Sequence, residues 1–163
     1  MSSAPTAAGQ GADLIDFISN LPLFENLDPE GLSVVKDHMS FQNLQRGEIF
    51  FNEWDRAEFV CFIESGSLDV MKKSGPETYS VLRNLRRGQS IGEMCLIENF
   101  PRSATVKTHT DTRVAILKRE GFDDIVDTSP AIAISILKNL ARMLSQNLKK
   151  TRSRLSDYML PLD

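Results

Sequence analysis

Short apolar or alternating runs, separated by turn residues, fill the middle of the chain. Breaks such as Arg46-Gly47, Ser65-Gly66 and Arg87-Gly88 divide them. The runs lie at residues 41–44, 49–51, 59–64, 68–72, 79–85, 104–109 and 113–117. Short strands at regular spacing are typical of a sandwich or jelly-roll barrel, whereas strands that alternate with long helices indicate a parallel sheet. The pattern therefore predicts a mainly β domain.

Helical patterns precede this β region. Apolar residues within 14–18 suit a short helix that ends at Asn20-Leu21-Pro22. Asp28-Pro29 has the form of an N-cap followed by proline at the first helical position, and we expect that helix to end near residues 38–40. Residues 1–12 have little to bury, so we expect a disordered tail there and a single domain over residues 13–163.

A second helical region follows the strands. A short helix is expected over residues 120–128, and Ser129-Pro130 has the form of an N-cap and proline that open the longest helical pattern in the chain. Nothing in the sequence obliges this helix to end before about Asp157. Its apolar stripe consists of Leu137, Leu140, Leu144 and Leu148.

Composition narrows the class of protein. Of the 163 residues, 41% are hydrophobic and 25% are charged, which is ordinary for a globular domain. The formal net charge of −3 argues against nucleic-acid binding by the body of the protein. No apolar stretch approaches the roughly 20 residues that span a bilayer, and the first residues lack the features of a signal peptide. We therefore expect a cytoplasmic protein in which Cys61 and Cys95 are buried, reduced thiols.

One segment, residues 90–106, carries candidate chemistry. Gly92 permits close backbone approach, and the first amides of a short helix after it would be free to face an anion. Glu93 stands at the start of that helix, and Arg102 offers a forked set of donors that suits a phosphate. A structural interpretation competes with this one: Ser90 and Glu93 match a capping box, and Arg102 could pair with Glu98 on the surface. Spacing alone favours the structural interpretation, because capping Glu and surface Arg residues are common.

The segment resembles the phosphate-binding cassette of cyclic nucleotide-binding domains. The matching stretches are Gly92-Glu93-Met94-Cys95-Leu96-Ile97 and Pro101-Arg102-Ser103-Ala104-Thr105-Val106. The resemblance extends over roughly residues 14–155 and includes the entry segment 23–27, the barrel strands and glycines of 47–48 and 63–70, and the closing helices of 122–148. It implies a jelly-roll-like β-roll with N-terminal helices, a short cassette helix and a long C-terminal helix from about residue 130.

The resemblance also implies a ligand and its contacts. Arg102 would neutralise the cyclic phosphate and Glu93 would accept the ribose 2′-hydroxyl. Backbone donors would come from Gly92, Glu93, Met94 and Ala104, with Cys95 and Ser103 completing the binding segment. Thr directly after the cassette Arg tends to accompany cGMP in the family; because Ser103 stands there, we favour cAMP and keep cGMP as the alternative.

One position departs from the family pattern. The turn after Phe51 has Trp54 where the family usually has glycine, which puts the backbone of that turn in doubt. Trp54 could instead cover an edge of the barrel or pack on a neighbour.

The resemblance further implies how such a module acts. Without a catalytic site it works by a population shift, in which the ligand draws in the cassette helix and the C-terminal helices move. Positions 137, 140, 144, 147 and 151 follow a heptad, so we expect a parallel homodimer along the last helix. In the catabolite activator family this stretch meets the nucleotide base across the dimer, and Asn147 falls near that point.

Other classes of protein share parts of this pattern. A metal-dependent barrel enzyme needs clustered ligands, and the chain offers only His38 and His109, so we expect neither catalytic activity nor a metal or other cofactor. A catabolite-activator-type regulator needs a helix-turn-helix, which the residues up to Asp163 do not supply, so direct DNA binding is not expected. A membrane role is not expected either, because no apolar stretch is long enough to span a bilayer. The remaining alternatives are a ligand-free β-roll scaffold and a fragment of a larger transcription factor, kinase or channel. The downstream effector protein is unknown.

Overall fold

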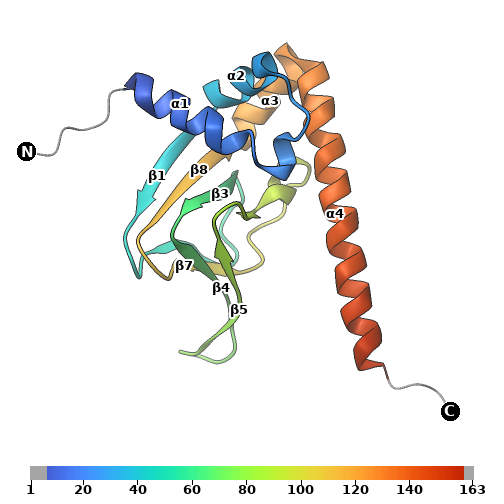
Figure 1. Cartoon of the computed structure of the whole chain (residues 1–163). Helices are drawn as coiled ribbons and strands as arrows, with labels where there is room; N and C mark the ends of the chain where they lie inside the picture. The colour runs from blue at the N-terminus through green and yellow to red at the C-terminus, as the bar shows by residue number, and fades with distance from the viewer. Residues whose placement is uncertain (1–6, 160–163) are drawn as a thin grey trace, which may run out of the picture.

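The computed structural model describes residues 7–159, and two antiparallel sheets flanked by helices make up the fold (Figure 1). The first sheet has the strand order β1-β8-β3-β6 and the second has the order β2-β7-β4-β5. In the first sheet the strands are β1 (Met39–Leu44), β8 (Thr112–Lys118), β3 (Phe59–Ser65) and β6 (Ser90–Ile91). In the second they are β2 (Ile49–Phe51), β7 (Thr105–Thr108), β4 (Ser67–Lys73) and β5 (Tyr79–Arg86). The predicted β-roll with flanking helices is confirmed.

Each run predicted from the sequence forms a strand. The pattern missed only β6, because two residues are too few to show a period. Strand β3 is buried on both faces, which explains its continuously apolar sequence. Val60 and Phe62 point into the core cluster shared with the helices, whereas Cys61 and Ile63 point into the cluster between the sheets. Alternate residues of a strand face opposite sides, so β3 joins the two halves of the core.

The N-terminal helices are α1 (Ala7–Ile18), the 3-10 helix η1 (Pro22–Phe24) and α2 (Pro29–Asp37). Asp28 caps α2 as predicted, since its side chain accepts a hydrogen bond of 2.7 Å from the amide of Gly31. Helix α1 begins at Ala7, so the expectation of a disordered tail up to residue 12 is wrong for residues 7–12. Once Leu14, Phe17 and Ile18 anchor the helix in the core, extending it toward the N-terminus needs no new nucleation. Residues 1–6 lie outside the described residues.

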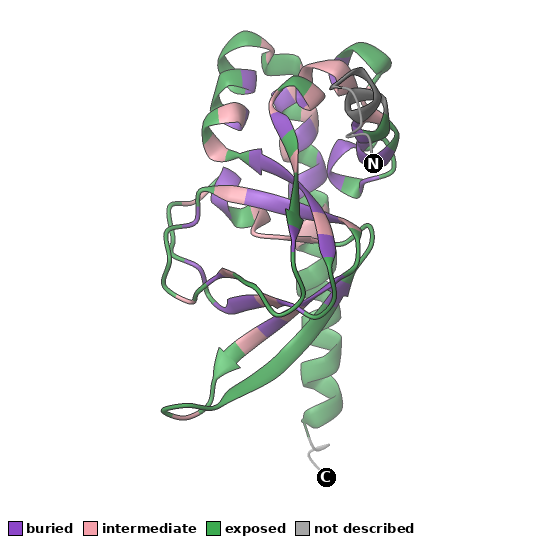
Figure 2. Ribbon diagram, turned by 90° about the vertical axis from the view of Figure 1, so that its left-hand side faces the viewer, coloured by how far each residue is buried: buried purple, intermediate pink, exposed green. Residues whose placement is uncertain are grey.

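Two helices close the domain, α3 (Arg119–Thr128) and α4 (Pro130–Tyr158). Pro130 opens α4 as predicted, but the Ser129 side chain makes no capping hydrogen bond. The first half of α4 packs on η1 and α3. Its buried Asn139 donates to the carbonyl groups of Leu23 (3.1 Å) and Glu25 (2.8 Å), which fixes the helix on the N-terminal segment. Every residue from Ser145 to Met159 is exposed, so the second half of α4 is unpartnered within the described residues (Figure 2).

Candidate functional site

Arg102 lies buried between the two halves of the core, with only 4% of its surface exposed. Its guanidinium stacks on the rings of Phe51 and Phe59, 4.1 and 4.4 Å from their centroids. Nη2 donates to the Phe59 carbonyl at 2.8 Å, but Nε and Nη1 have no hydrogen-bond partner among the described residues. Burial lowers the pKa of Arg102, because the charged form is disfavoured away from water. The expected surface pairing of Arg102 with Glu98 is therefore wrong. The two unpaired donors of Arg102, Nε and Nη1, are available to an anion.

Gly92 makes this placement of the guanidinium possible. It has φ +89°, and a Cβ atom there would lie 2.3 Å from Arg102 Nη1 and 3.0 Å from the Phe59 carbonyl oxygen. Both the backbone conformation and the close approach of Arg102 therefore require glycine. The short helix η2 (Glu93–Leu96) begins directly after it.

Glu93 is half-buried at the start of η2. The Ser90 hydroxyl donates to its Oε1 at 2.5 Å, while Oε2 accepts no hydrogen bond within residues 7–159. The capping-box interpretation required Glu93 to bond the Ser90 amide; that bond is not formed, and no side chain caps η2. One carboxylate oxygen is therefore oriented by Ser90, and the other remains available to a hydroxyl donor.

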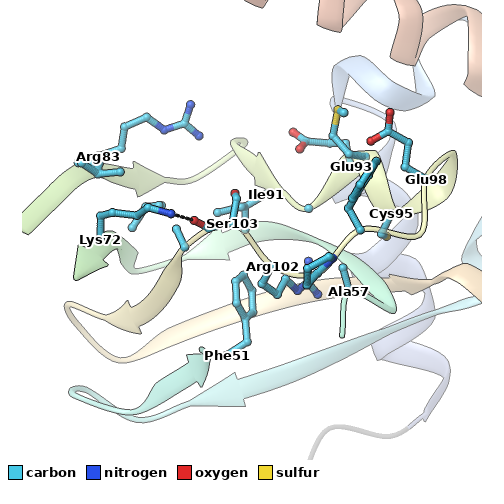
Figure 3. Close-up of a pocket in the computed structure, with 17 residues that line it drawn as sticks. Phe51, Ala57, Lys72, Arg83, Ile91, Glu93, Cys95, Glu98, Arg102 and Ser103 are labelled. Carbon is cyan, nitrogen blue, oxygen red and sulfur yellow. Dashed lines mark hydrogen bonds between the residues drawn. The ribbon is translucent and has the colours of Figure 1, made fainter. Parts of the chain in front are cut away.

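These groups face a cavity of about 520 Å³ between the cassette and the β4–β5 hairpin. The cassette residues predicted to form the binding segment all line it: Gly92, Glu93, Met94, Cys95, Arg102, Ser103 and Ala104. Figure 3 shows Lys72 and Arg83 on the hairpin side and Glu93 and Glu98 on the cassette side, with Arg102 between them. The cavity therefore combines one buried cation with apolar walls and a carboxylate at its rim.

Sequence reasoning missed the hairpin residues of the cavity. Lys72 pairs with Glu53 and donates to the Ser103 carbonyl at 2.7 Å, so it ties β4 to the cassette. Arg83, on β5, is exposed and makes no ion pair with another described residue. No local motif marks these positions, because only the pairing of β4 with β5 and β7 brings them to the cassette.

Two thiols lie close to the guanidinium. Cys61 and Cys95 are both buried and unpaired with each other, as predicted. Burial raises the pKa of the Cys61 thiol to about 12 and also raises that of Cys95, since a thiolate loses its hydration there. Both thiols are therefore neutral; Cys61 lies in the core between the sheets, and Cys95 lines the cavity.

Asn147 lies away from this cavity. It lines a second cavity of about 220 Å³ together with Met143 and Gln146 of α4. The opposite wall includes Arg83 and Glu93, which also line the first cavity. The two cavities thus adjoin, and α4 of the same chain forms one side of the second.

Trp54 adopts φ +75°, a conformation that favours glycine, and its side chain is 75% exposed. Its amide donates to the Arg102 carbonyl at 2.9 Å. The turn therefore keeps the backbone that a glycine would give it. Trp54 covers no edge of the barrel, which contradicts that suggestion.

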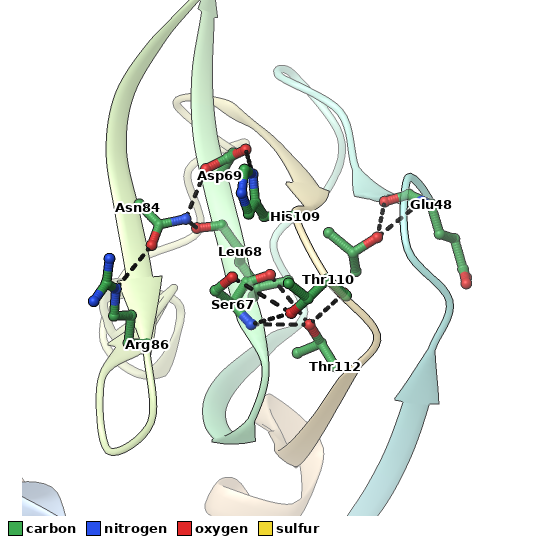
Figure 4. Close-up of polar contacts among 10 residues, drawn as sticks. Glu48, Ser67, Leu68, Asp69, Asn84, Arg86, His109, Thr110 and Thr112 are labelled. Atoms are coloured by element: carbon green, nitrogen blue, oxygen red, sulfur yellow. Dashed lines mark hydrogen bonds and ion pairs between the residues drawn. The ribbon is translucent and has the colours of Figure 1, made fainter.

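The two histidines serve local contacts. His109 Nδ1 lies 2.9 Å from Asp69 Oδ2 on the outer face of the second sheet, within a polar chain that continues to Asn84 (Figure 4). His38 Nδ1 lies 2.9 Å from the Val34 carbonyl. Among residues 7–159, no three His, Cys, Asp or Glu side chains gather in a group that could hold a metal ion. In that same part of the chain, no helix combines the length and apolar character needed to cross a bilayer.

Comparisons with known proteins agree on one family. Residues 41–129 match the model of the cyclic nucleotide-binding domain. The chain is 31% identical over 124 residues to a cAMP-dependent protein kinase regulatory subunit of Debaryomyces hansenii. The aligned stretch covers 76% of this chain and 26% of that protein. The chain is also 26% identical over 146 residues to the potassium/sodium hyperpolarization-activated cyclic nucleotide-gated channel 4 of Oryctolagus cuniculus, covering 85% of this chain and 12% of the channel. The chain thus spans about a quarter or less of these relatives.

Solved structures share the fold. A cyclic nucleotide-binding domain from Methylobacillus flagellatus has a TM-score of 0.78 at 20% identity, over 96% of this chain and 88% of that one. The regulatory domain of Toxoplasma gondii PKA, solved with cAMP, has a TM-score of 0.72 at 21% identity, over 86% of this chain and 51% of that one. Because the family model alone matches more than half of the residues, the chain belongs to the cyclic nucleotide-binding domain family.

Proposed function

We propose that the cavity binds a cyclic purine nucleotide with its phosphate on Arg102. The observation that carries this proposal is the pair of orphaned donors, Nε and Nη1, on a buried guanidinium. An unsatisfied buried donor costs roughly 1–3 kcal/mol, and more when it is charged, so a bound anion would recover that cost. A cyclic phosphodiester carries one negative charge, which one arginine neutralises.

The rest of the ligand follows from the cassette. The free oxygen of Glu93 is placed to accept a ribose hydroxyl, since a carboxylate has acceptor capacity beyond the bond from Ser90. The amides of Met94 and Ala104 make no hydrogen bond to another described residue and are candidate donors to the phosphate and ribose. Calorimetric titration with cAMP and with cGMP tests this assignment; heat of binding for neither nucleotide at millimolar concentration would refute it.

Ser103, rather than Thr, after the cassette arginine favours cAMP. One observation supports cGMP as the second candidate: Arg83 lines the cavity with an unpaired guanidinium. A guanidinium only donates, so it matches the two acceptors O6 and N7 of guanine, whereas adenine presents an amino donor beside N7.

Competition of the two nucleotides for one site decides between them. If guanine contacts Arg83, Arg83→Ala weakens cGMP binding by about tenfold and leaves cAMP binding unchanged. Arg86→Ala is the matched control, because Arg86 lies on the same strand with its Nε bonded to Asn84. Equal losses for both nucleotides would assign Arg83 a role independent of the base.

We propose that the bound nucleotide acts by moving the C-terminal helices rather than by catalysis. Leu96 of η2 is buried in the same core cluster as residues of α3 and α4, namely Phe122, Ile125 and Ile136. A shift of the cassette therefore changes the packing of α3 and α4. A ligand moves such an equilibrium only by its different affinity for the two positions. Hydrogen exchange with and without nucleotide tests the movement: slowed exchange confined to the cassette would mark a passive binder.

We also propose a parallel homodimer along α4. Its interface differs from the heptad expected from the sequence, because the domain itself covers part of that heptad. Leu140 is 2% exposed and packs on its own domain, so it cannot serve a partner. An accessible heptad lies beside it, with exposed or half-buried side chains throughout. Its members are Ile134, Leu137, Ala141, Leu144, Leu148, Thr151, Leu155 and Tyr158. Asn147 borders this seam, where its amide would be near a base that enters the second cavity.

A further inference from the structure

Arg119, the first residue of α3, has a guanidinium surrounded by neutral oxygen atoms. Nε donates to the Cys95 carbonyl at 2.7 Å, and Nη1 donates to Asn99 Oδ1 at 3.1 Å. Nη2 donates to the Glu98 carbonyl and lies 3.4 Å from the carbonyl oxygen of Ala57. Arg119 makes no ion pair with any described residue. Four of its five donors thus bond backbone and amide oxygen atoms rather than a charged group.

These acceptors are the back of the nucleotide cavity. Cys95, Glu98 and Ala57 all line it, and Asn99 belongs to the loop that runs from η2 to Pro101 and Arg102. Arg119 therefore holds this loop through hydrogen bonds on the side opposite the cavity. Its own backbone is fixed as well, because its amide donates to the Glu58 carbonyl at 2.8 Å.

The forked geometry is what makes this grip specific. Carbonyl groups of two cassette positions and one of the β2–β3 loop converge on one planar group, which a lysine ammonium on a flexible stem does not reproduce. Hydrogen bonds to a charged donor are stronger than those between neutral groups, so this cluster resists opening. Among the described side chains, only Arg119 bonds both the η2 end of the cassette and the β2–β3 loop, whereas Lys72 joins Glu53 of that loop to Ser103 at the other end of the cassette.

We propose that Arg119 is a positioning residue for the nucleotide, which locks the cassette to the first turn of α3. The assignment rests on the proposed nucleotide function, but the lock itself exists without ligand. It gives the cassette and α3 a common anchor, so that a change in one is passed to the other.

Hydrogen exchange in the ligand-free protein tests the lock. The amides of Cys95, Ile97 and Glu98 are the reporters, since each bonds a carbonyl inside the cassette. In Arg119→Leu these amides are expected to exchange about tenfold faster, and Arg119→Lys should restore part of the protection. Arg113→Leu is the matched control: this half-buried arginine stacks on Phe41 at 3.7 Å and touches no cassette residue. Equal exchange in Arg119→Leu and Arg113→Leu would overturn the proposal.

Calorimetry supplies the second arm. Arg119→Leu should bind cyclic nucleotide about tenfold more weakly than wild type, with Arg119→Lys between them and Arg113→Leu unchanged. Wild-type affinity in Arg119→Leu would refute its role in positioning the ligand. If the wild-type protein binds neither nucleotide, the proposed function fails, while the exchange experiment still decides whether Arg119 locks the cassette.

Discussion

Gly92 and Arg102 depend on each other, because the guanidinium occupies the space that a side chain at position 92 would fill. Gly92→Ala places a Cβ 2.3 Å from Arg102 Nη1 at φ +89°. We predict that this variant loses nucleotide affinity by at least about tenfold and is less stable by roughly 1–3 kcal/mol. Calorimetry and thermal unfolding measure the two effects.

Gly88→Ala is the control for this substitution. Gly88 also has a positive φ, of +80°, but a Cβ there meets nothing within 4 Å. Gly88→Ala should lose only the stability that the strained backbone costs, and its nucleotide affinity should be unchanged. Equal affinity losses in both variants would mean that strain, rather than displacement of Arg102, explains the effect.

Cys61 gives the protein a defined response to alkaline pH. Its pKa is raised to about 12 in the folded protein, above the ordinary value near 9, so the folded state holds the thiol proton longer than the unfolded state does. Stability is therefore fully present below about pH 9 and falls as the pH rises toward 12, by at most about 1.4 kcal/mol per pH unit. Denaturant titrations at pH 8 to 11 give the free energy of unfolding of wild type and of Cys61→Ala at each pH. This free energy should fall more steeply with pH in wild type than in Cys61→Ala; an equal pH dependence in the two proteins would contradict the assignment.

The cassette residues could be predicted from the sequence because they lie within one short segment. Gly92, Glu93 and Arg102 follow a recognisable pattern, and the structure brings all three to one cavity. Lys72, Arg83 and Arg119 could not be found in that way. They reach the cassette through strand pairing and through the placement of α3, which no local pattern encodes.

Helix α4 is held to the domain by one polar anchor within an apolar contact. Asn139 is buried and bonds the carbonyl groups of Leu23 and Glu25, and its own Oδ1 accepts from Arg142 at 2.8 Å. Asn139→Leu keeps the size of the side chain but leaves those carbonyl groups unpaired. We predict a loss of about 1–3 kcal/mol in the free energy of unfolding, measured with denaturant.

The same substitution at Asn147 is the control for this anchor. Asn147 is exposed and its side chain bonds no other described residue, so Asn147→Leu should change stability by no more than about 0.5 kcal/mol. Matching losses at both positions would show that Asn139 contributes nothing as an anchor.

Elements with a clear period or cap were predictable, and those set by contacts were not. The alternating runs gave every strand except two-residue β6, and Asp28 marked the start of α2. The start of α1 at Ala7 depends on its anchorage in the core, and the accessible face of α4 depends on which residues the domain covers. Leu140 looks like a seam residue in the sequence and is a core residue in the fold.

The exposed heptad of α4 determines whether the molecule acts alone. Leu148 and Leu155 are 61% and 62% exposed and, with Tyr158, form an apolar row on one face of the helix, which favours a surface that a partner covers. Light scattering at high micromolar concentration should report a dimer for wild type and a monomer for Leu148→Glu. Ser153→Glu adds the same charge on the opposite face of the helix and should remain dimeric. A wild-type monomer, with and without nucleotide, would refute the homodimer.

The buried guanidinium of Arg102 leads to the most direct test of ligand binding: calorimetric titration of wild type and Arg102→Leu with cAMP and cGMP. Loss of a buried charged partner costs roughly 2–5 kcal/mol in binding. Replacing a buried, partly unsatisfied cation with an apolar side chain should leave the ligand-free protein at least as stable as wild type, so unfolding will not explain the loss. We predict one nucleotide bound per wild-type chain and a loss of at least about thirtyfold in Arg102→Leu. Equal affinity in the two proteins would contradict the assignment of Arg102 as the phosphate site.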